Sequence, residues 1–304
     1  MKRFLKSQKG SAFVIFGLSA VILIGFVSLV TDVGMMALHK AKLTHAVDSA
    51  ALAGAQELVY HIYSAESRAT EYLNKNGYLN DSIDVDIEED GTAVRVTASY
   101  EVKLGLARVL GYSSQNVYAT AKGKVLPVIG VNKGARPFAI ENQDLEFGMQ
   151  YTLKEGGGDG TTGNYGGIAL GGRGANVYYN NIVDGYNDRL MVGDYIDTEP
   201  GNMSGPTENG INQLINECTH TPKCTYDHFD PNCPRVITVI IIDSLDVNGR
   251  ATVQITGFAS FFLEEVTGSG SESEVIGYFI KTITSGELGE SQEDYGLYGV
   301  RLME

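Results

Sequence analysis

The chain has 304 residues, enough for two ordinary domains, and its 37 glycines with only 20% charged residues predict a turn-rich protein rather than a helix bundle. Its net charge of −14 argues against nucleic-acid binding, because phosphate neutralisation needs a basic surface. The charge is also unevenly placed: residues 1–42 hold six basic side chains and one acid, so this segment carries +5 and the remainder −19. Such a split indicates a protein that faces two compartments.

Residues 11–30 are the strongest signal in the chain, because these twenty residues contain no charge, no proline and no amide side chain. A helix rising about 1.5 Å per residue would carry them across roughly 30 Å, the hydrocarbon thickness of a bilayer. The excess of positive charge before this segment predicts that the N-terminus is inside and the rest of the chain outside. We therefore predict a basic cytoplasmic segment at 1–10 and a transmembrane helix at 11–30, and take as its membrane residues Ser11, Phe13, Phe16, Gly17, Gly25, Phe26 and Val30.

Two kinds of N-terminal processing compete with an intact anchor. A secretory signal would share the basic start, but its apolar stretch is usually about 7 to 15 residues and ends at a small-residue cleavage site. The basic residues, Gly10 and the unbroken apolar helix also resemble the type IV prepilin arrangement, in which a peptidase cuts after the glycine. The glutamate that such pilins carry five residues after the cut is Ile15 here, so cleavage after Gly10 stays an open alternative.

The helical pattern continues beyond the apolar segment. Spacings of three and four residues place on one helix face Met36, Lys40, Leu43, Val47, Ala50, Gly54 and Leu58. We therefore predict one helix of about fifty residues. Its small residues would let another helix or a sheet approach closely. That surface could serve as a seam between molecules or dock on the helix's own domain.

Three stretches together resemble a known family: Lys9-Gly10-Ser11-Ala12, Thr31-Asp32-Val33-Gly34, and the alanine-rich segment 40–55 with its Asp48-Ser49-Ala50-Ala51-Leu52-Ala53-Gly54-Ala55 core. They are similar to the TadE/TadG-like group of Flp (tight adherence) pilus-assembly proteins. The resemblance implies a membrane-anchored protein or minor pseudopilin outside the cytoplasm. Its implied partners are the membrane and other pilus-assembly or pilin subunits, including copies of itself. Nothing in the resemblance implies an enzyme.

The segment after the long helix predicts a small α+β module. Residues 64–75 have a helical pattern that ends at Asn76-Gly77, and alternating residues at 83–87 and 94–102 predict a β-hairpin. A short helical insert at 104–111 precedes a further strand from 117 toward Pro127. We assign this module, with the helix extension, to 31–127. Similar modules occur in the family that the N-terminus resembles.

The remaining part, 128–304, is predicted to be a β-rich extracytoplasmic domain. Residues 155–181 hold ten glycines but no P-loop lysine, so an exposed loop is expected rather than a phosphate site. A short helix at 208–217 follows acidic turns that lack EF-hand spacing. Strands are expected from residues rich in β-branched and aromatic side chains, at 235–243, 251–264, 274–284 and 295–302. The fold class is therefore α+β, with a C-terminal antiparallel sheet or sandwich.

All three cysteines lie in one short loop together with two histidines, in the order Cys218, His220, Cys224, His228 and Cys233. Four such ligands would satisfy a tetrahedral zinc site. A disulfide competes, because the predicted topology places the loop outside the cytoplasm, where thiols oxidise. The sequence favours one disulfide, preferably Cys218 with Cys233 and otherwise involving Cys224. Zinc and unpaired thiols are the alternatives.

The chain lacks the sequence signatures of common catalytic sites: His-Glu-x-x-His, Gly-x-Ser-x-Gly and Ser-x-x-Lys. We therefore expect no enzyme activity, no catalytic residues and no cofactor. The predicted function is a membrane-anchored pilus-assembly or pilin-like structural protein, located in the cell membrane or in an extracellular filament. The alternative is a membrane-tethered binding or adhesion module that takes a metal or a glycan.

Overall fold

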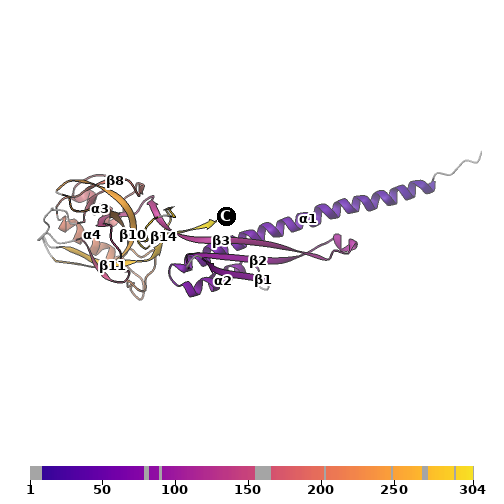
Figure 1. Ribbon diagram of the computed structural model, residues 1–304, viewed down its shortest axis with the longest axis horizontal. Helices are drawn as coiled ribbons and strands as arrows, with labels where there is room; N and C mark the ends of the chain where they lie inside the picture. Colours follow the sequence, from indigo (N-terminus) through magenta and orange to yellow (C-terminus); the bar gives the residue numbers. More distant parts are fainter. Residues whose placement is uncertain are drawn as a thin grey trace, which may run out of the picture. The chain divides into compact units, whose positions relative to one another are not determined.

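The computed structural model describes residues 9–78, 82–88, 91–154, 166–201, 203–247, 249–268, 273–290 and 292–303. The chain divides into two compact units, of which the first comprises residues 1–58, 63–124 and 302–304 and the second comprises 59–62 and 125–301 (Figure 1). Both units combine helices with β-strands, so the predicted α+β class is confirmed.

Unit 1 is built on one continuous helix, α1 (Lys9–Leu58), whose 50 residues confirm the predicted length. From Leu43 to Gly54 the predicted face is buried, including Val47 and Ala50, while Leu58 at its end is half-buried. The short helix α2 (Ala65–Lys75) packs on this half of α1 through its own alanine-rich side. A single 3-10 turn, η1 (Ile62–Ser64), leads into α2.

Three antiparallel strands complete unit 1: β1 (Ser82–Glu88), β2 (Ala93–Lys103) and the first part of β3 (Ser114–Val131). Their register pairs Val85 with Val96 and Val96 with Ala121, so apolar residues of the three strands lie side by side on one face. The 3-10 helix η3 (Ala107–Leu110) connects β2 to β3. The predicted hairpin, helical insert and following strand are thus all present.

Small residues allow the sheet to lie directly on α1. A Cβ added at Gly123 of β3 would lie 2.4 Å from the Ala51 carbonyl oxygen, which is far closer than atoms can pack. Gly54 on α1 likewise has Ala69 of α2 and Val94 of β2 at 3.1 Å from where its Cβ would be. The small-residue face of the helix therefore docks on its own module, which was one of the two predicted uses.

Unit 2 contains a sheet in the order β4 (Ala135–Glu141), β9 (Val236–Ile242), β10 (Thr252–Thr267), β11 (Glu274–Ile280) and β5 (Gln150–Lys154). At its edge β8 (Tyr195–Thr198) pairs with both β10 and β6 (Ile168–Ala169). The expected antiparallel sheet is in fact mixed, because β4 and β9 are parallel. Parallel neighbours need a long crossover, and here it contains the helices α3 (Ala175–Val183) and α4 (Ser204–Asn216).

Both faces of this sheet are covered, which explains the unbroken apolar run Val239–Ile242 of β9. Ile237, Val239 and Ile241 pack with residues of α3 and α4. Ile240 and Ile242 pack on the opposite side with the end of β3 and with β7 (Leu190–Met191). A strand that is buried on two faces has no need of polar residues at alternate positions.

The second layer of strands in unit 2 is formed by short elements around the end of β3. Both β7 and β13 (Glu287–Leu288) pair with β3 in antiparallel fashion, and β12 (Thr282–Ile283) pairs in parallel with β14 (Leu297–Met303). Of the exposed glycine-rich loop predicted at 155–181, residues 155–165 lie outside the described residues. The remainder is not a loop throughout, because it contains β6 and most of α3.

Replacing Gly123 with alanine should destabilise unit 1, because the added methyl group must displace the backbone of α1. Overpacking of this kind costs about 1–3 kcal/mol of unfolding free energy. Thermal unfolding of the detergent-solubilised chain, followed by circular dichroism, measures the loss. Gly34→Ala is the control. Gly34 lies on α1, and nothing lies within 4 Å of the Cβ that the substitution adds. Equal stability of the two variants would contradict the close packing.

Candidate functional site

The first candidate site is the apolar N-terminal half of α1. Its large side chains are exposed, with Phe13 at 79% and Val30 at 73% of their maximal accessibility and Phe16 and Phe26 similarly open. Nothing lies within 4 Å of the positions that a Cβ would take at Gly17 and Gly25. In Figure 1 the first turns of α1 extend beyond the strands of unit 1.

The helix containing these residues is long and apolar enough to cross a membrane. Its best 18-residue window has a mean hydropathy of 2.8, and only 6% of that window is buried. The core helix of a soluble protein would be mostly buried, so this surface needs lipid or another protein around it. Gly10 and Ser11 belong to the first turn of α1, where the side-chain surroundings lie outside the described part of the chain.

Asp32 lies two residues beyond this apolar segment and ties α1 to the loop between β2 and β3. Its Oδ1 accepts a hydrogen bond from the Gly105 amide at 2.8 Å, and its Oδ2 accepts one from the Ala107 amide at 2.6 Å. Ser28, one turn earlier, donates its hydroxyl to Oδ2 at 3.3 Å. The carboxylate is only 7% exposed, and it satisfies amides at the start of η3 that the short helix leaves unpaired.

These contacts lower the pKa of the Asp32 carboxyl group, with the Ala107 amide as the largest cause and the Gly105 amide next. Hydrogen bonds to a carboxylate favour its charged form. In the sequence, Asp32 was recognised only as part of the Thr31-Asp32-Val33-Gly34 stretch that resembles the family. The signal that could have singled it out is its place as the one acid among the first 42 residues, directly after an apolar span.

We expect Asp32→Asn to lower the melting temperature at pH 7, because an amide has one acceptor oxygen for two backbone donors. The folded-state pKa of Asp32 lies below its unfolded value of about 3.9, so its stabilisation is present above that pH and is lost as pH falls through the folded pKa. The difference between native and variant should therefore shrink in acid. Melting curves at several pH values in detergent measure this difference.

Asp48→Asn is the control, since Asp48 is half-buried on the same helix and no polar contact is recorded for it among the described residues. It should leave the melting temperature nearly unchanged at every pH. A pH-independent loss in Asp32→Asn would contradict the role of the charge.

The second candidate site is the cysteine loop of unit 2. Cys218 follows the end of α4, Cys224 lies in the loop, and Cys233 comes just before β9. One ligand atom from each of these cysteines and from His220 lies within 4.8 Å of the other three. The cysteines are 2–4% exposed and pack against Phe262 and Ile280. All three, which lie within the described residues, are free thiols, so the predicted Cys218–Cys233 disulfide stays a prediction.

His220 is oriented by two partners. Its Nδ1 lies 3.7 Å from the Cys218 sulfur, and its Nε2 lies 3.7 Å from a carboxylate oxygen of Asp230. Asp230 is in turn held in the loop, because it accepts hydrogen bonds from the amides of Asn232 and Cys233. The imidazole therefore points one nitrogen at the sulfurs and the other at an acid.

The environment shifts the pKa values of the Cys218 and Cys233 thiols in opposite directions. Burial raises the pKa of the Cys233 thiol to about 12. Burial acts in the same direction on Cys218, but hydrogen bonds from the Cys224 backbone, His220 and Cys233 outweigh it and lower that pKa to about 6. The cluster thus favours negative charge on the Cys218 sulfur.

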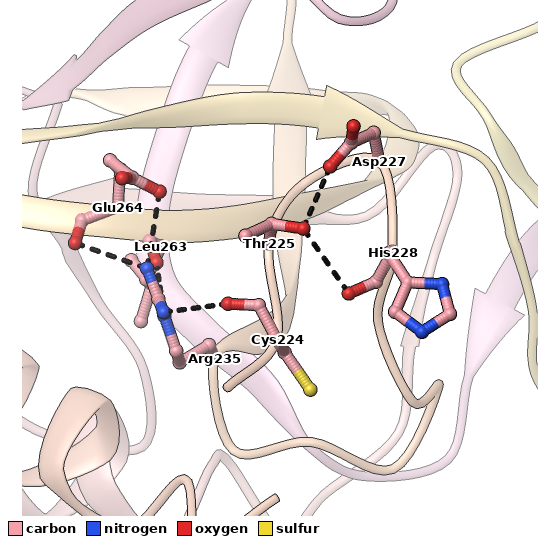
Figure 2. A network of polar contacts seen from close by, with 7 residues as sticks. All are labelled: Cys224, Thr225, Asp227, His228, Arg235, Leu263 and Glu264. Carbon is pink, nitrogen blue, oxygen red and sulfur yellow. Dashed lines mark hydrogen bonds and ion pairs between the residues drawn. The ribbon is translucent and has the colours of Figure 1, made fainter. Parts of the chain in front are cut away.

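His228, the fifth predicted ligand, is not part of this group of four. Its side chain is exposed, while its backbone exchanges hydrogen bonds with Thr225 at 2.9 and 3.2 Å. Figure 2 shows how Thr225, which also donates to Asp227, folds this tip of the loop. Four of the five candidate ligands in the sequence thus lie together, and His228 lies apart from them.

Arg235 fixes the loop to β10 and was missed by sequence analysis. Its buried guanidinium donates to the carbonyl oxygens of Cys224 at 2.9 Å and Leu263 at 2.8 Å, and to the Glu264 carboxylate at 3.1 Å (Figure 2). It also lies over the ring of Phe262. The planar, multiply donating guanidinium suits such a junction. The sequence signal that could have indicated its role is the position of a charged residue directly before the apolar strand β9.

A long, exposed helix that is apolar enough to cross a membrane, joined to a small α+β unit, is typical of membrane-anchored proteins. Within that class, residues 10–57 match the family model described as "Putative Flp pilus-assembly TadE/G-like". The resemblance seen in the sequence is thereby confirmed over nearly all of α1. No curated protein and no solved structure matches the chain.

Proposed function

We propose that this chain is a membrane-anchored pilus-assembly or pilin-like structural protein with its N-terminus in the cytoplasm and its bulk outside. The observation that carries the proposal is the continuity of α1, whose first half is apolar and exposed while its second half is the core of unit 1. The family match over the same residues supports a role in pilus assembly rather than catalysis.

The energetic argument for lipid or protein around residues 11–30 is simple. Burying one large apolar side chain contributes about 1.5–3 kcal/mol, and this segment exposes more than ten of them. The basic residues before it favour the cytoplasmic side for the N-terminus. In this proposal 1–10 is cytoplasmic, 11–30 spans the bilayer, 31–127 is the α+β module, and 128–304 is the β-rich extracytoplasmic domain.

The loop between β2 and β3, which Asp32 binds, supports the proposal that the membrane span ends near residue 30. An apolar groove lies between α1 and this loop, lined among others by Phe26, Leu29, Leu104 and Tyr112. Tyr112 is well exposed, and tyrosines favour the boundary between lipid and water. The carboxylate of Asp32 would thus lock the module to the helix at the outer membrane surface.

Placing arginines at the centre of the apolar segment should release the protein from the membrane. Val21→Arg with Leu23→Arg alters two exposed residues, and each buried arginine costs about 2.5–3.5 kcal/mol in a bilayer. Fractionation and alkaline extraction of membranes measure retention. Tyr63→Arg, at an almost fully exposed position outside the segment, should leave membrane retention unchanged. Unchanged retention of the double variant would contradict the anchor.

Electron microscopy of sheared cell-surface material, probed for this chain, separates the two structural roles. Recovery in filaments is expected of a pilin-like subunit, and retention in the inner membrane is expected of an assembly factor. Absence from both fractions would contradict either role. The alternative, a tethered module that binds a metal or a glycan, would draw on the cysteine and histidine group of unit 2.

A further inference from the structure

We propose that unit 2 contains a structural zinc site whose ligands are the sulfurs of Cys218, Cys224 and Cys233 and the Nδ1 of His220. This inference is independent of the proposed pilus role, because it rests only on the loop between α4 and β9. A tetrahedral Zn²⁺ with bonds of about 2.3 Å to sulfur and 2.0–2.1 Å to nitrogen separates its sulfur and nitrogen ligands by about 3.6 Å. The Cys218 sulfur and His220 Nδ1 lie 3.7 Å apart.

The composition of the group favours zinc in a structural role. Four ligands from one chain fill a tetrahedral shell and leave no position for water or substrate, which distinguishes structural from catalytic sites. Thiolates with one imidazole select zinc over hard cations such as calcium. The sulfurs are buried against Phe262, so the shell around them is apolar and closed.

The second coordination shell provides an independent observation. Histidines that bind metals through one ring nitrogen usually present the other to a carboxylate, which fixes the ring. Asp230 occupies that place at Nε2, on the side of His220 away from Cys218. Arg235, whose guanidinium also pairs with Glu264, donates to the Cys224 carbonyl and so fixes the backbone of this ligand.

A disulfide explains less of this arrangement. It would join two sulfurs and would not account for the third thiol, for His220 beside the sulfurs, or for Asp230 at 3.7 Å from His220 Nε2. The four ligand atoms instead converge within 4.8 Å, although they come from four separate points of the loop. A zinc ion would connect the end of α4 to the start of β9 and close the loop.

The test uses the full chain, purified in detergent without reductant from the compartment where it matures. Metal analysis should find one zinc per chain, and three thiols should react after chelation and denaturation. Cobalt exchanged into the native protein should show thiolate-to-metal charge transfer and the visible bands of tetrahedral coordination. Zinc-free protein with a Cys218–Cys233 disulfide in peptide maps would overturn the proposal.

His220→Ala and His228→Ala form a matched pair for the nitrogen ligand. We expect at least a tenfold loss of zinc affinity in the first, measured by competition with a chelator, and none in the second. His220→Cys should restore binding as a four-cysteine site. Equal zinc retention in both alanine variants would overturn the assignment of His220. The arginine variants of α1 should keep their zinc, so a failed anchor and a failed metal site give different results.

Discussion

Residues 12–30 of α1 expose almost nothing but apolar side chains, and water is a poor solvent for such a surface. The same helix continues without a break into the core of unit 1. Whatever surrounds the first half, lipid or neighbouring helices, therefore also fixes the position of the module packed on the second half. Asp32 marks the change between the two environments, because its carboxylate is turned to backbone amides of the module.

The helices and strands could be predicted from the sequence wherever the spacing of apolar residues is regular. Helical spacing at Leu43, Val47 and Ala50 predicted one helix face, which is the buried one, and the β-branched run at 235–243 predicted a strand. Such patterns are local, because each residue's neighbours in the element decide its environment. The parallel pairing of β4 with β9 could not be foreseen, since it depends on where the crossover helices pack.

The polar contacts were harder to predict because they join distant segments. Asp32 bonds to amides 73 and 75 residues away, and no spacing rule connects these positions. In the cysteine loop the sequence contains two histidines, His220 and His228, and both were candidate metal ligands. Only the folded loop distinguishes them, because His220 faces the sulfurs while His228 is exposed at a turn. Unit 2 thus combines a conventional two-sided core with a loop whose ligands converge on one point.

Protease protection tests whether the N-terminus of the chain lies in the cytoplasm and the bulk of the chain outside. Cells with an opened outer envelope would carry the protein with one tag before residue 1 and another after residue 304. If the chain has this orientation, external protease removes the C-terminal tag, while the N-terminal tag survives on a short membrane-bound fragment. Recovery of both tags on intact, soluble protein would contradict it.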